Sequence, residues 1–201
     1  NGEVVTAKRA VVTVPLNVLN SVSFDPPLSA VKQEASQLKH VGGGYKVFFE
    51  VEGDPGAVMT LSRSTDSPLI GSFTCKRGEQ HSVLAGFSLE PGALEKPVSE
   101  WQTILEEFIP GVRLLSTFGH DWGDDALSNG SWCTYRPGCF ERFADELPHH
   151  EGPLYFASGD TTEGWRGFIE GAIASGSRTA VNVADSLTSQ AAASVKQPAQ
   201  A

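Results

Sequence analysis

A glycine turn that carries an acid, followed by the start of a long helix, is the segment best suited to bind a ligand. Residues 159–171 read GDTTEGWRGFIEG and follow the apolar run LYFA at residues 154–157. The free N–H groups and partial positive charge at a helix start favour a polar, electron-rich ligand. Asp160 can accept hydrogen bonds from ligand hydroxyls. Many α/β folds contain such a unit, so the geometry alone leaves the ligand open.

Lys46 is a second unusual position, because it interrupts the apolar run YKVFFEV at residues 45–51. A lysine buried in an apolar environment would be a candidate for a functional role. An outward-facing lysine on a half-exposed strand is the alternative interpretation.

Metal chemistry is not indicated by the sequence. Cys75, Cys133 and Cys139 are odd in number and lack CxxC spacing. His149 and His150 are adjacent and lack the spacing of a metal site. We therefore expect no metal ligands, and the cysteine usage favours a reducing, intracellular setting.

Charge and hydropathy exclude several classes of function. The chain has 201 residues and a net charge of -9, with no cluster of Lys and Arg, which argues against binding to nucleic acid. No apolar run approaches the ~20 residues of a membrane helix, so we expect no transmembrane segment.

The elements that must position these residues alternate between strands and helices. Val- and Thr-rich residues 4–15 predict a strand or hairpin that Pro15 ends, and Ser29 caps a helix over residues 30–39. Apolar spacing predicts a second helix over 98–108 and a long helix over 164–187. Further strands of a largely antiparallel sheet are predicted at residues 45–51, 58–61, 69–75, 83–87 and 114–118, and a separate short strand at 154–157.

Three segments resemble the flavin-containing amine oxidase family. GDTTEGWRGFIEGAIASGSRTA, at residues 159–180, resembles its C-terminal flavin motif, with a Gly–acid pair, a Trp, a Gly–aromatic pair and an acid–Gly pair in this order. Residues 7–29 resemble the segment leading from the flavin domain into the substrate domain, and residues 132–138 (WCTYRPG) resemble the strand beside the flavin. The resemblance is greatest to fungal monoamine oxidases that bind FAD non-covalently.

The resemblance assigns cofactor-binding roles to the glycine turn and the helix start. Gly159 and Asp160 match positions that bind the ribityl and diphosphate part of FAD. Gly167, Phe168 and Ile169 match the helix start that faces the pyrimidine edge of the isoalloxazine ring. A helix N-terminus would stabilise the negative charge that the ring gains on reduction.

It also assigns residues around the flavin ring. Trp122 matches a Trp that packs against the flavin, and Ser131 stands where mammalian monoamine oxidases carry the cysteine that bonds to the ring. Cys133 lies two residues further and could share the side of Ser131 on a strand. When the Thr134–Tyr135 and Pro137–Gly138 pairs are aligned with the family, Ser131 and not Cys133 stands at the position of the covalent cysteine. The resemblance therefore implies non-covalent FAD.

Catalytic positions follow from the same resemblance. Trp132 and Phe168 match two aromatic residues that flank the substrate path before the flavin, where they would orient a neutral amine. Ordinary core aromatics are the alternative interpretation. Lys46 matches the lysine that the family holds near flavin N5 through a water.

The implied fold class is α/β, with a mixed-sheet α+β substrate domain and part of a discontinuous Rossmann-like FAD domain. Residues 1–16 and 129–188 would belong to the FAD domain, residues 17–128 to the substrate-binding domain, and residues 189–201 to a tail. The fingerprint GxGxxG does not occur in the sequence. We therefore expect FAD binding to require an N-terminal half, and this chain alone to be inactive.

The implied activity is oxidation of an amine to an imine, with dioxygen reduced to hydrogen peroxide. Expected partners are an amine substrate, dioxygen and the N-terminal half of the same polypeptide, with a homodimer as a further option. A cytoplasmic or peroxisomal location is expected. An L-amino-acid or polyamine oxidase, a non-catalytic domain of this fold, and a structural α+β domain with a fortuitous motif remain alternatives.

Overall fold

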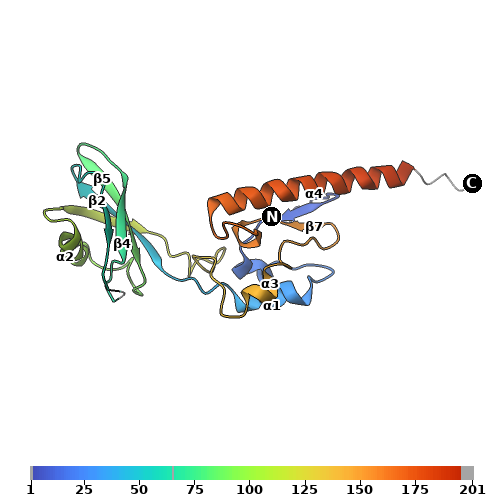
Figure 1. The fold of residues 1–201 in the computed structure, drawn as a ribbon, viewed down its shortest axis with the longest axis horizontal. Helices are drawn as coiled ribbons and strands as arrows, with labels where there is room; N and C mark the ends of the chain where they lie inside the picture. The colour runs from blue at the N-terminus through green and yellow to red at the C-terminus, as the bar shows by residue number, and fades with distance from the viewer. Residues whose placement is uncertain (1, 65, 196–201) are drawn as a thin grey trace, which may run out of the picture. The chain divides into compact units, whose positions relative to one another are not determined.

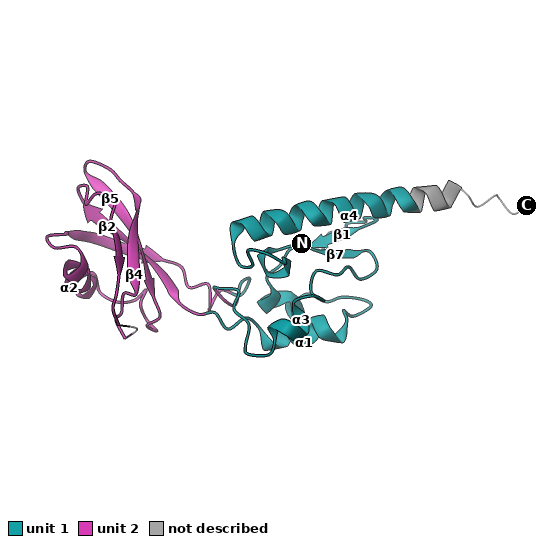
Figure 2. Cartoon of the chain, viewed as in Figure 1, with its two compact units in different colours: residues 1–42, 126–128, 132–201 teal, residues 43–125, 129–131 magenta. Residues whose placement is uncertain are grey.

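The computed structural model describes residues 2–64 and 66–195, which fall into two compact units (Figures 1 and 2). Unit 1 comprises residues 1–42, 126–128 and 132–201, and unit 2 comprises residues 43–125 and 129–131. Each unit has a hydrophobic core of its own.

Unit 2 is a five-stranded sheet in the spatial order β3, β4, β5, β2, β6. The strands are β2 (Tyr45–Glu52), β3 (Met59–Leu61), β4 (Gly71–Lys76), β5 (His81–Ser88) and β6 (Leu114–Gly119). Every pairing among these described strands is antiparallel. The prediction of a largely antiparallel sheet is therefore confirmed, whereas the mixed sheet in the implied fold class is wrong for this unit. The strands β3, β4 and β5 follow one another as hairpins, and β6 returns antiparallel beside β2.

One face of this sheet packs against a helix. Val47, Phe49 and Val51 alternate along β2 and are fully buried in the core of the unit. Trp101 and Leu105 of α2 (Val98–Phe108) belong to the same core. Phe49 and Trp101 meet edge to face with ring centroids 5.1 Å apart, a favourable aromatic geometry.

The opposite face, which we call the open face, carries aromatic side chains and Lys46. Phe48 stacks on Phe118 at 5.1 Å, and Phe73 lies 6.1 Å from Phe87 between ring centroids. The Lys46 Nζ atom lies 5.6 Å from the centre of the Phe87 ring. Strand registry places two further large apolar side chains on this face, Met59 and Leu61, which are 77% and 75% exposed.

Unit 1 is built on a short parallel strand pair. β1 (Ala10–Val12) pairs with β7 (Leu154–Phe156) although more than 140 residues separate them. A core of seven buried side chains joins this pair to a 3-10 helix η1 (Leu16–Ser21), α1 (Ala30–Leu38) and α3 (Phe140–Phe143). Within unit 1, Lys32 is buried, and its Nζ donates to the Glu146 carbonyl at 2.9 Å and pairs with Glu151 at 3.0 Å.

Residues 17–42 therefore pack with unit 1 and not with the sheet of unit 2, contrary to the expected boundary at residue 17. The reason is that η1 and α1 contribute Leu16, Leu19 and Ala35 to the same core as Phe156. Which unit contacts FAD and which contacts substrate stays a prediction. The short helices η1 and α3 were not expected from the sequence, and β1 is shorter than the expected strand over residues 4–15.

The long helix α4 (Ile169–Val195) starts five residues later than its pattern predicts. Trp165 and Gly167 have φ angles of 51° and 77°, and these left-handed positions prevent the helix from starting earlier. Gly171, Ser175 and Thr179, spaced by four, are buried, and Thr179 donates to the Phe156 carbonyl at 3.0 Å.

The expected tail from residue 189 is helical as far as Val195, and residues 196–201 of that tail lie outside the described part. Among the residues that the structure describes, no helix combines the length and the apolar character needed to cross a membrane.

Candidate functional site

The glycine turn after β7 has a fixed conformation. It forms a short 3-10 helix, η2 (Gly159–Thr161), in which Ser158 Oγ accepts the Asp160 N–H at 3.1 Å and Thr161 Oγ1 accepts the Ser158 N–H at 2.9 Å. The Gly167 N–H donates to the Gly159 carbonyl at 2.9 Å. The turn and the segment before α4 thus fold back on each other, which brings Gly159 and Asp160 close to Gly167.

Large apolar side chains remain exposed beside this turn. Trp132 is 41% exposed, Phe168 is 63% exposed and Ile169 is 81% exposed. A Cβ atom on Gly167 would lie 3.0 Å from Cys133 Cβ, so the Gly167 turn packs directly on the segment that follows Trp132. The structure does not support the alternative that Trp132 and Phe168 are core residues, because core aromatics of this chain are almost fully buried. Their catalytic roles stay predictions.

The start of α4 offers donors next to this apolar surface. The backbone N–H groups of Ile169 and Glu170 precede the first helical hydrogen bonds, and no acceptor for them lies among the described residues. A flat aromatic group with an electron-rich edge would find both an apolar surface and N–H donors here. The residues present therefore fit an isoalloxazine ring.

Three predicted site residues, Lys46, Trp122 and Ser131, belong to unit 2. Lys46 is exposed on the open face, as its outward-facing interpretation expects. Trp122 is 52% exposed and meets the His120 ring edge to face at 4.4 Å. The Gly130 N–H donates to the Trp122 carbonyl at 3.0 Å, and Ser131 is the next residue after Gly130.

The predicted strand at residues 132–138 is reduced to one isolated bridge between Trp132 and Gly42, both in unit 1. A Cβ on Gly42 would lie 2.3 Å from the Trp132 carbonyl oxygen, so only glycine allows this approach.

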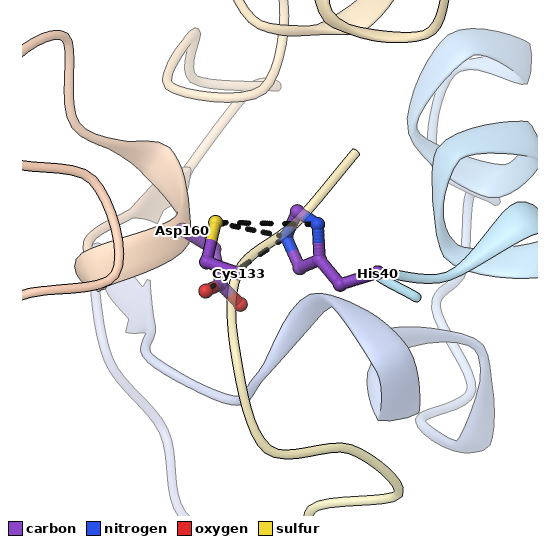
Figure 3. A group of neighbouring side chains, drawn as sticks. All are labelled: His40, Cys133 and Asp160. Carbon is purple, nitrogen blue, oxygen red and sulfur yellow. Dashed lines mark hydrogen bonds and ion pairs between the residues drawn. The ribbon is translucent and has the colours of Figure 1, made fainter. Parts of the chain in front are cut away.

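A cluster that the sequence did not predict joins Asp160 of the glycine turn to His40 and Cys133 (Figure 3). His40 Nε2 lies 3.3 Å from Cys133 Sγ and 3.8 Å from Asp160 Oδ1. The other carboxylate oxygen of Asp160 accepts the Leu16 N–H at 2.9 Å. Sequence separations of 93 and 120 residues hide this contact.

The protonation of this cluster is set mainly by burial. Burial lowers the pKa of His40 below its ordinary 6.5 and outweighs the opposing effect of Asp160. The 3.8 Å separation would suit an ion pair, but a neutral His40 does not form one at neutral pH. Burial, followed by the Asp160 charge, raises the pKa of Cys133 to about 12, so Cys133 is a thiol.

The same three residues carry atom types that bind metals. Cys133 Sγ, however, lies 4.0 Å from His40 Nδ1 as well as 3.3 Å from Nε2. A metal ion bound to His40 Nε2 would lie in the ring plane, along the lone pair of that nitrogen. The Cys133 thiol lies beside the ring instead, so the arrangement does not favour an ion shared by the two residues. The charge of Arg166, which also acts on His40 and Cys133, opposes a cation as well.

Comparison with known proteins identifies relatives of this chain. A family profile described as flavin containing amine oxidoreductase matches residues 1–184. Pseudooxynicotine dehydrogenase from a Pseudomonas species is 39% identical over 91% of this chain. Nicotine dehydrogenase from Pseudomonas putida is 30% identical over 88% of it. The chain spans 37% and 36% of the lengths of these two relatives.

Solved structures share the fold. Putrescine oxidase bound to putrescine has a TM-score of 0.74 at 19% identity, over 88% of this chain and 42% of that one. Cyclohexylamine oxidase from Brevibacterium oxydans has a TM-score of 0.74 at 17% identity, over 94% and 45%. The similarity found is to bacterial nicotine-pathway enzymes, so the narrower expectation of a fungal monoamine oxidase is not supported.

Proposed function

This chain belongs to the flavin-containing amine oxidoreductase family, and from that premise we propose that it forms part of an FAD-dependent amine oxidase. The enzyme would oxidise an amine to an imine, which water hydrolyses to a carbonyl compound and ammonia or an amine. The observation that carries the proposal is the exposed apolar surface of Trp132, Phe168 and Ile169 beside the turn that holds Asp160. The activity is proposed for the whole polypeptide that contains these residues.

The chain's own residues would hold the ring end of FAD without a covalent bond. When bound, the flavin supplies the two-electron oxidation of the C–N bond. Asp160 would accept hydrogen bonds from the ribityl hydroxyls, and the free N–H groups of Ile169 and Glu170 would stabilise negative charge on the ring. Ser131 offers a hydroxyl where a covalent link would need a thiol. Because GxGxxG does not occur here, we assign the adenine end to residues outside these 201.

The amine would be oriented by aromatic side chains and a lysine. Trp132 and Phe168 would flank it, and Lys46 would hold a water near the reacting atoms. Dioxygen is the proposed electron acceptor. In an intact enzyme, Lys46→Met should slow reoxidation by dioxygen, measured by stopped-flow absorbance after anaerobic reduction. Unchanged reduction and reoxidation rates would remove Lys46 from the mechanism.

The proposed substrate is an amine with an apolar or aromatic body. The open face that carries Lys46 also carries Phe48, Phe87 and Phe118, and such rings favour apolar partners. A polyamine would instead bring a second ammonium group next to a lysine. The 39% identity to pseudooxynicotine dehydrogenase supports pseudooxynicotine as the first amine to test. Polyamine and L-amino-acid oxidation remain the alternatives.

The test uses the native polypeptide that contains residues 1–201, purified with its flavin. Pseudooxynicotine, nicotine, putrescine and an L-amino acid are each added without oxygen, and bleaching of the flavin absorbance is followed. We expect pseudooxynicotine, an amine with an aromatic body, to reduce the flavin fastest, and oxygen uptake with peroxide formation to follow on adding air. A protein without flavin absorbance would support a non-catalytic domain, and reduction by putrescine alone would support a polyamine oxidase.

A further inference from the structure

Arg166 stands between the two left-handed residues of the turn that precedes α4. Trp165 and Gly167 have φ angles of 51° and 77°, and a residue with a side chain adopts this conformation only at a cost in free energy. The Phe168 N–H donates to the Trp165 carbonyl at 3.0 Å, and the two rings meet edge to face with centroids 5.9 Å apart. The orientation of Phe168 therefore depends on the conformation of residues 165–167.

The Arg166 side chain joins this turn to the segment at residues 135–140. Its Cζ atom lies 5.6 Å from the centre of the Tyr135 ring and 4.9 Å from the centre of the Phe140 ring, which are cation–π distances. The two rings meet edge to face at 5.7 Å, so they form an aromatic pair beside the guanidinium. Its Nη2 atom donates to the Thr162 carbonyl within the turn. We call this link between the turn and the aromatic pair the Arg166 clamp.

The guanidinium of the Arg166 clamp has no acidic partner within residues 2–64 and 66–195, because none of their ion pairs includes it. Its Nε and Nη1 atoms are buried and have no hydrogen-bond partner there. A buried cation needs attractive neighbours to offset the loss of water. The two ring faces and the Thr162 carbonyl supply such attraction. Loss of a ring should therefore loosen the turn.

We propose that Arg166 is a positioning residue that holds Phe168 and the first N–H groups of α4 in the orientation that the amine and the flavin require. The aromatic pair fixes the guanidinium, the guanidinium fixes the turn, and the turn fixes the ring that would flank the amine. The inference rests on the proposed function, which assigns Phe168 to the amine and the start of α4 to the flavin ring. Arg166 itself is assigned no contact with either ligand.

Substitution of Arg166 tests the clamp in the native flavoprotein. Arg166→Met keeps a long side chain but removes the charge and the donors. The pseudooxynicotine concentration that gives half-maximal flavin reduction, measured anaerobically by stopped flow, should then rise about tenfold. Arg166→Lys keeps the charge without the planar group and should recover part of this loss. Arg142→Met is the matched control and should change nothing, because Arg142 lies 5.0 Å from the Phe143 ring but is exposed and paired with Glu34.

The Tyr135 ring provides a second matched pair of variants. Its hydroxyl is buried without a hydrogen-bond partner among the described residues, so Tyr135→Phe should behave as wild type. Tyr135→Leu removes the ring and should weaken amine binding as Arg166→Met does. Hydrogen exchange of the peptide covering residues 159–171 should become faster in Tyr135→Leu and Arg166→Met but not in Tyr135→Phe. Faster exchange throughout unit 1 would indicate general unfolding and would overturn the positioning role.

A double-mutant cycle shows whether Arg166 acts through Phe168. In a Phe168→Ala background, Arg166→Met should change the half-maximal pseudooxynicotine concentration much less than in wild type. An equal effect in both backgrounds, or none in either, would overturn the inference, whereas flavin reduction by the amine in wild type would still support the proposed function. A native protein without flavin absorbance would contradict the proposed function itself. Faster exchange at residues 159–171 in Arg166→Met would even then support the Arg166 clamp.

Discussion

Two cysteines of this chain, Cys75 and Cys133, show how strongly one residue type depends on its surroundings. Cys75 is exposed, and its thiol lies 3.2 Å from the Val83 carbonyl. Cys133 lies beside His40 and Asp160, where burial and the carboxylate charge raise its pKa to about 12. Because the thiolate is the reactive form, these environments should differ greatly in reactivity.

Labelling with a disulfide reagent at pH 8 should therefore be much slower at Cys133. We expect Cys75 to react at least about a hundredfold faster, since Cys133 is almost entirely protonated at that pH. The rates are measured by mass spectrometry of peptides after timed quenching. Cys139 is followed separately in its own peptide. Slow labelling of Cys75, or fast labelling of Cys133, would contradict the assigned environments.

His40 predicts how stability depends on pH. Burial lowers its folded pKa below the ordinary 6.5, so between these two values the unfolded chain binds a proton that the folded chain does not. The free energy of unfolding should therefore decrease as the pH falls through this window. Urea unfolding between pH 8 and pH 5 measures this slope, and His40→Gln should reduce it. A variant with the wild-type slope would show that other groups cause the dependence.

At the scale of single elements, α4 combines two kinds of glycine. A Cβ on Gly171 would lie 2.2 Å from the Trp165 carbonyl oxygen and 2.7 Å from Thr162 Cγ2, so Gly171 is required for close packing. Gly176 has no atom within 4 Å of such a Cβ. The two positions lie in one helix and differ in their surroundings, which makes them a matched pair.

Gly171→Ala should destabilise unit 1 by roughly 1–3 kcal/mol, because backbone atoms must move to admit the methyl group. Gly176→Ala should raise stability by about 0.5–1 kcal/mol, because alanine favours an open helical position. Thermal unfolding followed by circular dichroism compares both with wild type. Equal effects of the two substitutions would show that the contact at Gly171 does not constrain the helix.

At the scale of the whole molecule, two cores stabilise two units. Leu105 is fully buried in the unit 2 core between α2 and the sheet, and Leu147 is fully buried in the unit 1 core. Residues from both ends of the sequence build unit 1, because β1 pairs with β7. The two cores can therefore be perturbed separately.

Leu105→Ala and Leu147→Ala should each cost about 2–5 kcal/mol within the unit that carries the change. Hydrogen exchange read by mass spectrometry should then rise mainly in peptides of that unit. Phe118→Ala, on the open face, is the control and should cost less, since Phe118 is 52% exposed. A uniform rise over both units after either core substitution would indicate one cooperative structure.

Local patterns in the sequence determined most elements. The spacing of apolar residues predicted α2 over residues 98–108, and the composition of YKVFFEV predicted β2. The Ser29 cap of α1 was also correct, since its side chain accepts the Lys32 N–H. The motif at residues 159–171 indicated the family, which the profile match confirms. These features depend on nearby residues, whose periodicity reflects one buried face.

Only the tertiary structure decided what lies under the motif. The contact of His40 with Cys133 and Asp160 joins three segments that no local pattern connects. The start of α4 depends on left-handed residues at 165 and 167, and the boundary of unit 1 depends on the packing of α1 with β7. The sequence therefore determined the family and the flavin motif, whereas chain folding decided which side chains surround Asp160, because burial and pKa depend on distant neighbours.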